Sequence, residues 1–387
     1  ITYEDVTNVD AVGLITARSG LEIGLAGVGG TITSAGIITA PHIKTGGTLN
    51  NTGFGEDVLA AITTGAGNVA IGKDALTANT TGNNNIAIGK NALDASTTQN
   101  RSIAIGVNAL SGANAAYNIA IGYEALLADT TGNINIAIGD EAMTANTTGA
   151  ENVAVGNYAL DANTTASQNT AIGTYALTDN TTGTANVAVG YRALFDNTTA
   201  SNNTGIGFKA LNANTTGYQN VAVGQNALLS NTTGFVNVAI GAEALDANTT
   251  GDKNIAVGKG ALSANTTADN NIAIGWDALG ANTTGGENTA VGTQALQTAT
   301  TDSANTGIGY RALETCNGAD YNTAVGSRCL EDTTTGAQNT AVGYNALHAN
   351  TTANNNTAVG YRALEACTTT GDRNTAVGSE ALEAAST

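Results

Sequence analysis

The stretch NVAVGQNALLSNTTGFV, residues 220–236, is followed without a gap by NVAIGAEALDANTTGDK, residues 237–253. Both units open with an Asn-Val-Ala-[Val/Ile]-Gly pentad, reach an Ala-Leu pair at their eighth and ninth residues, and continue to Asn-Thr-Thr-Gly. The glycine of the pentad recurs nineteen times, and sixteen of the eighteen intervals are 17 residues. These glycines are Gly72, Gly89, Gly106, Gly122, Gly139, Gly156, Gly173, Gly190, Gly207, Gly224, Gly241, Gly258, Gly275, Gly292, Gly309, Gly326, Gly343, Gly360 and Gly378. A strict internal period is typical of a solenoid or repeat array.

We number each repeat from its Asn, which is position 1. Position 2 is Val, Ile or Thr, position 3 is Ala or Gly, position 4 is Ile or Val, and positions 8 and 9 are almost always Ala and Leu. A helix would need apolar residues at i, i+3, i+4 and i+7 over ten or more residues, and the unit lacks that pattern. We therefore predict an all-β fold, a parallel β-solenoid (β-roll) of about nineteen 17-residue coils. The strands are expected at positions 1–5 and 8–11, and the stack would be roughly 90 Å long.

Strand alternation predicts which positions share a face of the coil. Positions 2 and 4 fall on one face and positions 1 and 3 on the other. We expect the Ile or Val at position 4 and the Leu at position 9 to fill the interior, because a narrow interior needs a near-constant volume. The Asn column at position 1 is expected to stack amide on amide along the axis. Glycine at position 5 permits a positive φ.

The Ala column at position 3 suggests a second packing surface. On the face opposite the expected core, a solvent-exposed position would vary in identity, as positions 6 and 7 do. We therefore predict that another backbone packs there, in lateral association around a symmetry axis, with a homotrimer as the preferred closure. The alanines assigned to this protomer interface are Ala70, Ala87, Ala104, Ala120, Ala137 and Ala154.

Outside the period, residues 1–40 are glycine-rich and alternating, which predicts a β-structured neck or attachment segment. Residues 41–67 are expected to form a connector or entry cap, and residues 68–387 the β-solenoid. An exposed end coil would offer an unpaired strand edge, so a cap is physically reasonable.

Composition excludes several classes of protein. Apolar residues make up 42% of the 387 residues and recur on a strict period, which favours order over disorder. The net charge of −18 argues against nucleic acid as a partner and against an anionic membrane surface. No stretch of 18 or more apolar residues occurs, so we expect no membrane insertion.

The sequence offers little chemistry. The two histidines, His42 and His348, belong to no cluster with metal-ligand spacing. No phosphate-binding loop is present, and the uniform loops leave no cleft, so we expect no enzyme activity and no cofactor. Cys316 and Cys367 fall three coils apart, about 14 Å by strand spacing, too far for a disulfide. Cys329 replaces a packed Ala and is expected to be an inert buried thiol.

Two threonine patterns have more than one interpretation. The last six coils carry Thr at position 2, either as a near-isostere of Val with its hydroxyl bonded to backbone or as a more polar section. An ice-binding solenoid is the less favoured hypothesis, because this column is expected on the core face. The Asn-Thr-Thr triplets match the N-glycosylation sequon, and turn chemistry explains them equally well.

Aromatic residues recur at position 6, which predicts an exposed contact surface. They would either stack on sugar rings of a glycan or receptor, or pack against neighbouring coils or protomers. The residues assigned to glycan or receptor contact are Tyr123, Tyr191, Trp276, Tyr310, Tyr344 and Tyr361.

The units NTAVGYNAL (residues 339–347) and NTAVG (residues 374–378) resemble repeats in phage and bacterial tail-fibre proteins. They also resemble a longer version of the repeats in YadA-like trimeric adhesin heads. The resemblance covers about residues 68–387 and implies a left-handed β-roll that trimerises. The opening YEDVTNVDAVGLITAR, residues 3–18, resembles segments of structural proteins in marine cyanophages.

Together these features predict a virion fibre, of the tail or capsid, that projects from the particle and takes part in host-surface attachment. The expected partners are further copies of the chain, other virion or surface proteins bound through the N-terminal region, and a host glycan or protein. The alternatives are a bacterial trimeric adhesin or extracellular filament at the cell surface. A polysaccharide-degrading β-helix is disfavoured because catalytic residues are lacking.

Overall fold

The computed structural model describes residues 24–25, 28–29, 49–112, 115–366 and 371–383. The chain divides into residues 1–43 and residues 44–387. In the first unit the structure describes β1 (Gly24–Leu25) and β2 (Val28–Gly29), which pair antiparallel. The rest of the predicted neck lies outside the described residues.

The second unit contains a row of twenty strands of three residues each. They are β3 (Thr52–Phe54), β4 (Val69–Ile71), β5 (Ile86–Ile88), β6 (Ile103–Ile105), β7 (Ile119–Ile121), β8 (Ile136–Ile138), β9 (Val153–Val155), β10 (Thr170–Ile172), β11 (Val187–Val189), β12 (Thr204–Ile206), β13 (Val221–Val223), β14 (Val238–Ile240), β15 (Ile255–Val257), β16 (Ile272–Ile274), β17 (Thr289–Val291), β18 (Thr306–Ile308), β19 (Thr323–Val325), β20 (Thr340–Val342), β21 (Thr357–Val359) and β22 (Thr375–Val377).

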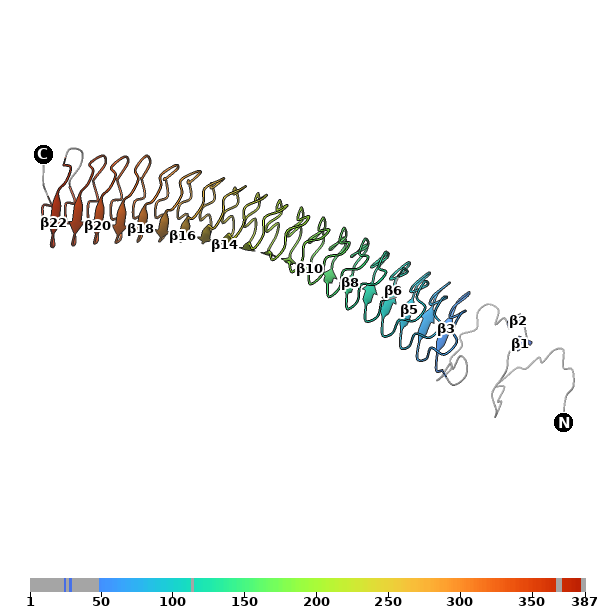
Figure 1. Cartoon of the computed structure of the whole chain (residues 1–387). Helices are drawn as coiled ribbons and strands as arrows, with labels where there is room; N and C mark the ends of the chain where they lie inside the picture. The colour runs from blue at the N-terminus through green and yellow to red at the C-terminus, as the bar shows by residue number, and fades with distance from the viewer. Residues whose placement is uncertain (1–23, 26–27, 30–48, 113–114, 367–370, 384–387) are drawn as a thin grey trace, which may run out of the picture. The chain divides into compact units, whose positions relative to one another are not determined.

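Every strand of this row pairs in parallel with the next one along the chain, equivalent position on equivalent position, as Ala222 on Ala239. The row is open, with β3 beside β4 at one end and β22 beside β21 at the other (Figure 1). The described residues contain no helix, and none therefore that could cross a membrane. The predicted parallel solenoid of 17-residue coils is confirmed. Its stacking starts one coil early, at β3, within the segment predicted as connector.

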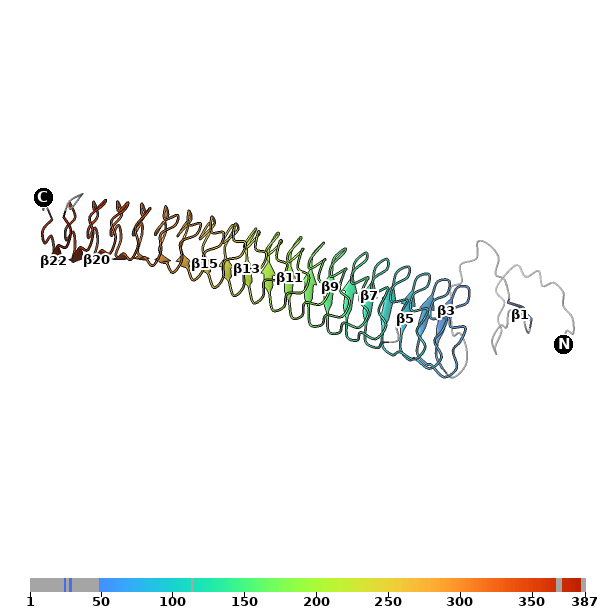
Figure 2. The same cartoon turned by 45° about the horizontal axis from the view of Figure 1, so that its top comes forward.

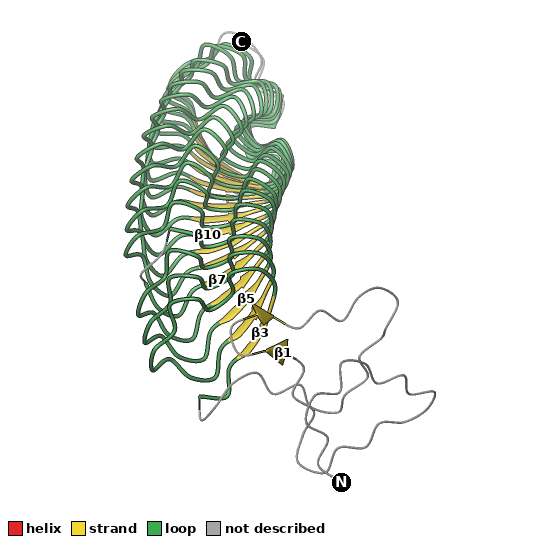
Figure 3. Cartoon of the chain, turned by 90° about the vertical axis from the view of Figure 1, so that its right-hand side faces the viewer, coloured by secondary structure: helices red, strands yellow, loops and turns green. Residues whose placement is uncertain are grey.

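Each coil contains one strand, at positions 2–4, and turns complete the rest of the loop. The strands form one wall and the turns the remainder of each coil (Figures 2 and 3). The second strand predicted at positions 8–11 is wrong, because the residues at positions 7 and 9 are left-handed, with φ of +56° at Asn226 and +51° at Leu228. Two such residues close together curve the chain sharply. Axial pairing nevertheless continues there, since Leu228 N–H donates to the Ala244 carbonyl at 3.0 Å.

The interior is lined by positions 1, 3, 8, 9 and 12, which reverses the predicted orientation of the strand. Asn220, Ala222 and Leu228 are 0% exposed, whereas Ile240 at position 4 is 41% exposed. The prediction that position 4 fills the interior is therefore wrong. The Asn side chain must lie inside to bond turn carbonyls, and strand alternation then places positions 2 and 4 outside.

The alanines predicted as a protomer interface, Ala70, Ala87, Ala104, Ala120, Ala137 and Ala154, are each 0% exposed within the single chain. A side chain already buried in its own coil has no surface left for a second chain, so this prediction is wrong. Position 3 is small because the preceding Leu packs on it. A Cβ added to Gly205, which occupies this position, would lie 3.3 Å from Leu194 Cγ and 3.1 Å from the Ala210 carbonyl oxygen.

Two buried asparagine ladders brace the stack and confirm the predicted axial Asn column. At position 1, the Asn220 amide donates to the Gly234 carbonyl at 2.8 Å and accepts from Asn237 N–H at 2.9 Å. At position 12, the Asn231 amide donates to Asn214 Oδ1 at 2.8 Å. The second ladder contains the Asn of the Asn-Thr-Thr triplets, so these side chains are buried turn elements rather than accessible glycan acceptors.

Several coils carry another residue than Asn at position 12, among them the coils of Asp129 and Cys316. Asp129 is 0% exposed, accepts from Gly132 N–H at 2.9 Å and from the Asn118 amide at 3.0 Å, and burial raises its pKa to about 7. Cys316 Sγ contacts the Ala319 carbonyl oxygen at 3.4 Å. Cys329, at position 8, is buried as predicted, and burial raises its pKa to about 12. Cys367 lies outside the described residues.

Candidate functional site on the aromatic edge

One edge of the coil carries the side chains at positions 6, 7 and 10, and we call this surface the aromatic edge. Gly224 at position 5 ends the strand with φ +139°, and Asn226 at position 7 is left-handed. The side chains of Ala227 and Leu228 lie in the interior, and the side chains at the neighbouring variable positions therefore point outward. The edge therefore varies freely while the coil beneath it stays constant.

Five rings of four consecutive coils gather on this edge between residues 158 and 208. Tyr158 and Tyr175 stack with centroids 5.2 Å apart, and Tyr191 and Phe208 stack at 5.6 Å. Tyr175 also meets Tyr191 and Phe195 edge to face, each at 6.2 Å. These geometries are the ones that aromatic quadrupoles favour, worth about 0.5–1.5 kcal/mol per pair.

Two cations lie over these rings. The Arg192 guanidinium is 4.8 Å from the centroid of Phe195 and 5.6 Å from those of Tyr175 and Tyr191. The Lys209 ammonium is 5.4 Å from the centroid of Phe208. Such cation–π contacts contribute about 0.5–1 kcal/mol each at exposed sites. The cluster thus stabilises its own coils and leaves a mixed apolar and polar surface.

The predicted contact residues separate into different surroundings. Tyr191 belongs to the cluster, Tyr344 and Tyr361 form a stacked pair at 5.6 Å, and Tyr310 has Arg311 over its ring at 5.2 Å. Tyr123 is 47% exposed and Trp276 48%. Their role in glycan contact stays a prediction.

Tyr158, Tyr175 and Phe195 are members of the cluster that were not predicted as contact residues. They occupy positions 7 and 10, which the turn brings onto the same edge as position 6. Linear spacing did not reveal this, because it depends on the left-handed residue at position 7. Knowledge of that turn would have placed all three positions on one surface.

Towards the C-terminus the same edge becomes ionic. The buried Glu331 carboxylate lies 3.0 Å from His348 Nε2, 3.6 Å from the Arg311 guanidinium and 3.7 Å from that of Arg328. These polar contacts link three consecutive coils. They satisfy one another, so we interpret them as stabilising contacts along the edge.

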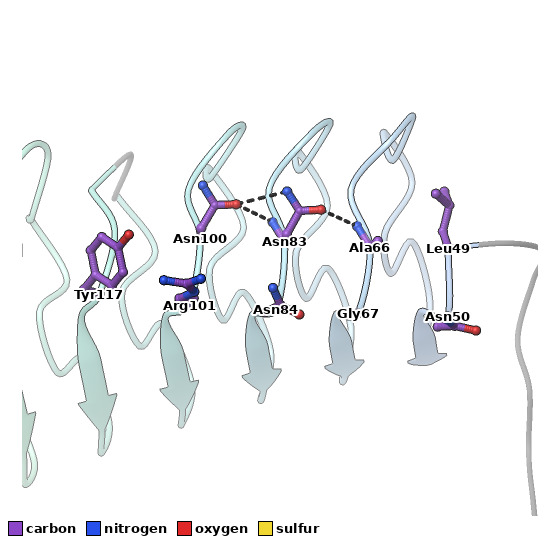
Figure 4. Close-up of a pocket in the computed structure, with 9 residues that line it drawn as sticks. All are labelled: Leu49, Asn50, Ala66, Gly67, Asn83, Asn84, Asn100, Arg101 and Tyr117. Atoms are coloured by element: carbon purple, nitrogen blue, oxygen red, sulfur yellow. Dashed lines mark hydrogen bonds between the residues drawn. The ribbon is translucent and has the colours of Figure 1, made fainter.

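The opposite edge carries a polar trough of about 510 Å³ along positions 16 and 17 of the first coils (Figure 4). Ala66 N–H donates to Asn83 Oδ1 at 2.9 Å, and Asn83 N–H donates to Asn100 Oδ1 at 2.8 Å. Arg101 lies 5.8 Å from the Tyr117 ring centroid. The Asn83 and Asn100 amides are thus engaged in holding successive coils together.

The outer face of the strand row is the third surface, formed by positions 2 and 4. All thirty-eight positions in the nineteen repeats are Val, Ile or Thr, so the face carries no charge although the chain has a net charge of −18. The six C-terminal threonines lie on this outer face rather than in the core, as the half-exposed Thr289 and the exposed Thr340 illustrate. The sequence argument against an exposed Thr array is therefore wrong.

Among the residues that the structure describes, no group of three or more His, Cys, Asp or Glu side chains lies close enough to hold a metal ion. A scan against known protein families gives no match to this chain, and no curated protein matches it. The chain is thus characterised by its fold, a tandem-repeat parallel β-solenoid with an aromatic edge and an uncharged outer sheet face.

Proposed function

We propose that this chain is a structural fibre protein of a virion, in a tail or capsid fibre, which projects from the particle and takes part in host-surface attachment. The observation that carries the proposal is the unbroken register from β3 to β22. Each coil contacts chiefly its neighbours, so the number of repeats sets the length of the stack. Such a molecule is suited to separating its two ends, and the resemblance of residues 3–18 to cyanophage proteins favours a virion.

The N-terminal region would attach the fibre to other virion proteins, and the solenoid would reach the host surface. The proposal assigns no catalytic step and no cofactor to the chain. Turnover of a host polysaccharide by the purified chain would contradict that part of it. A bacterial trimeric adhesin or extracellular filament remains the alternative, because the same coils would serve a cell surface equally well.

The test of location is an antibody raised against residues 51–383. It is applied to intact phage particles and to uninfected cells that carry the gene, and both are viewed by electron microscopy. Label on projecting fibres of the particle supports the proposal. Label on uninfected cells and none on particles would overturn it in favour of the adhesin.

As part of the proposal, the chain assembles as a homotrimer through the outer face of positions 2 and 4. Two columns of β-branched side chains over nineteen coils cover about 600 Å² in projection. A standard interface buries about 800 Å² per partner, so this face alone, which a trimer shares between two neighbours, is smaller than a standard interface. A large uncharged patch is unusual on a monomer and marks an interaction surface. A second copy has the same axial period and matches the face along its length.

A triple face variant, Ile138→Glu, Val223→Glu and Ile308→Glu, tests this interface. Each substitution adds a charge to the outer face and leaves the coil interior unchanged, so we expect single chains in sedimentation with an unaltered circular dichroism spectrum. Gln225→Glu on the aromatic edge is the control and should stay trimeric. A parent chain that sediments as a monomer would contradict the proposed assembly.

An ice-binding surface is a second candidate, favoured by the outward threonines of the last six coils. A regular array of hydroxyls and methyl groups on a flat face is the feature such a surface needs. This candidate, unlike the trimer that would cover the same face, requires thermal hysteresis by the purified chain that is lost in Thr323→Val and Thr340→Val. Growth of ice crystals unchanged by the chain would remove this candidate.

A further inference from the structure

A shallow polar hollow of about 420 Å³ opens on the aromatic edge around Trp276. Its lining includes Lys259, Gly260, Ser263 and Asp277 as well as the tryptophan. A second hollow of about 450 Å³ shares Ser263 and Asp277 and continues to Gln297. The two form one trough that crosses several coils along the direction of stacking.

Missing side chains create this trough. Gly260 is the only glycine at position 7 among the nineteen repeats, and Gly280 is the only one at position 10. The backbone does not require glycine at position 7, since Asn226 and Asp277 adopt the same left-handed conformation there, with φ of +56° and +51° against +68° for Gly260. A Cβ at Gly260 would meet Asp277 Oδ1, so the effect of this glycine is to admit the Asp277 carboxylate into the hollow.

The polar groups around this space include the Asp246 carboxylate. Its Oδ1 is buried beneath the surface of the trough. Burial also raises the pKa of Asp246. Glu243 and Asp277 add two more carboxylates to the lining, and Lys259 adds one ammonium group. Beside them, the indole of Trp276 is 48% exposed.

We propose that this trough binds a neutral polysaccharide that lies along the solenoid, with one sugar ring against Trp276. The ring C–H bonds of a sugar carry slight positive charge and fit the negative face of the indole. Sugar hydroxyls would donate to the Asp277 carboxylate, which lines both hollows. A concave surface with an aromatic platform and a few convergent polar groups is the general form of a small-ligand site.

Charge separates this ligand from anionic competitors. Three carboxylates against one ammonium repel an anionic polymer such as nucleic acid or a uronate. A cationic peptide is the competitor that this net negative lining attracts, so it is included among the probes. A neutral saccharide is repelled by neither sign of charge, and its hydroxyls serve as both donors and acceptors.

This inference rests on the proposed function in that it names the ligand class of the host contact. The two can fail separately, because saccharide binding is measured on the purified chain and location is measured on particles. Saccharide binding by the purified chain without antibody label on particles would support the saccharide site and contradict the proposed virion fibre.

The experiment uses the full chain, whose single tryptophan is Trp276, so intrinsic fluorescence reports on the site directly. Maltohexaose, cellohexaose and laminarihexaose are the neutral probes, and hexalysine and polygalacturonate are the charged ones. We expect at least one neutral probe to shift the emission. Calorimetry with that probe should then give a measurable Kd.

Filling the trough is the decisive perturbation. Gly260→Asn and Gly280→Gln introduce side chains that other coils carry at the same positions, Asn226 and Gln297, so the fold should tolerate them. We expect each to weaken binding at least tenfold, as Asp277→Asn should, with circular dichroism unchanged. Val107→Ala, at the exposed position 6 of a coil outside the trough, is the control and should bind like the parent.

Three results would overturn the inference. They are the absence of any emission change with all three neutral hexasaccharides, binding of a charged probe in place of the neutral ones, or filled variants that bind as tightly as the parent. Each is readable from the same titrations.

Discussion

Gly224→Ala should destabilise the solenoid through the backbone rather than through packing. The native φ of +139° belongs to a region that only glycine adopts readily. A non-glycine residue held there costs about 1–3 kcal/mol. An added Cβ would also lie 2.5 Å from the Gly241 carbonyl oxygen and 2.7 Å from its carbon. The clash can be relieved only by moving the next coil.

That movement weakens the hydrogen bond from Gly241 N–H to the Val223 carbonyl, now 2.8 Å long. A backbone hydrogen bond contributes about 1 kcal/mol net. Together the two effects predict a loss of about 3 kcal/mol in the free energy of unfolding. Because a solenoid coil interacts mainly with its neighbours, the loss should be local to β13 and β14.

Urea titration followed by circular dichroism measures the loss, and hydrogen exchange locates it. Gly280→Ala is the control, because its added Cβ would meet nothing closer than the Asp277 carbonyl oxygen at 3.3 Å and its φ is not left-handed. We expect a change within about 1 kcal/mol for the control. Equal unfolding midpoints for the two variants, or unaltered exchange at β13 and β14, would refute the reasoning.

Three further changes test the interior. Asn220→Ala should lower the free energy of unfolding by about 2–4 kcal/mol in urea titration, because loss of the amide leaves Asn237 N–H and the Gly234 carbonyl without this partner. Gln225→Ala, at an exposed position, is the control and should change it very little. Equal losses in the two variants would contradict the ladder. Asp129 has a pKa of about 7 in the native state against about 3.9 in the unfolded chain, so the native state holds the proton to higher pH. Its contribution to stability should therefore fall as pH rises from 4 through 7, by up to about 4 kcal/mol. Asp129→Asn should remove that slope in unfolding measured across this range, and an unchanged slope would contradict the assignment. Leu228→Ala should cost about 2–5 kcal/mol by leaving a cavity, and a smaller effect in thermal unfolding would mean that the leucine is not packed.

The sequence predicted the period, the parallel stacking and the axial asparagine column, because these depend on spacing and residue type alone. It did not predict which strand face is inside. β-Branched residues at positions 2 and 4 resemble a core, and alanine resembles a surface that another chain covers. The deciding requirement is that turn carbonyls such as Gly234 need a buried donor, which Asn220 supplies. The sequence alone does not indicate this pairing, because the Gly234 carbonyl approaches Asn220 only in the folded coil.

The aromatic edge shows the same limit. Position 6 was identifiable from its run of rings, but its union with positions 7 and 10 depends on left-handed turn residues such as Asn226. The trough around Trp276 depends on two glycines that break no motif. Both glycines differ from the residues that the other repeats carry at the same positions. That difference indicates a hollow only after the positions have been placed on the surface of the coil.

Thiol accessibility tests most directly whether alanine lies inside each coil. Ala239→Cys and Gln225→Cys are placed separately in the triple face variant, and sedimentation verifies that the samples are single chains. Ala239 is 0% exposed and Gln225 is exposed. We expect Gln225→Cys to react rapidly with a thiol reagent under native conditions, and Ala239→Cys to react no faster than the buried native Cys329 until denaturant is added. Rapid labelling of Ala239→Cys in the folded single chain would contradict the interior described here.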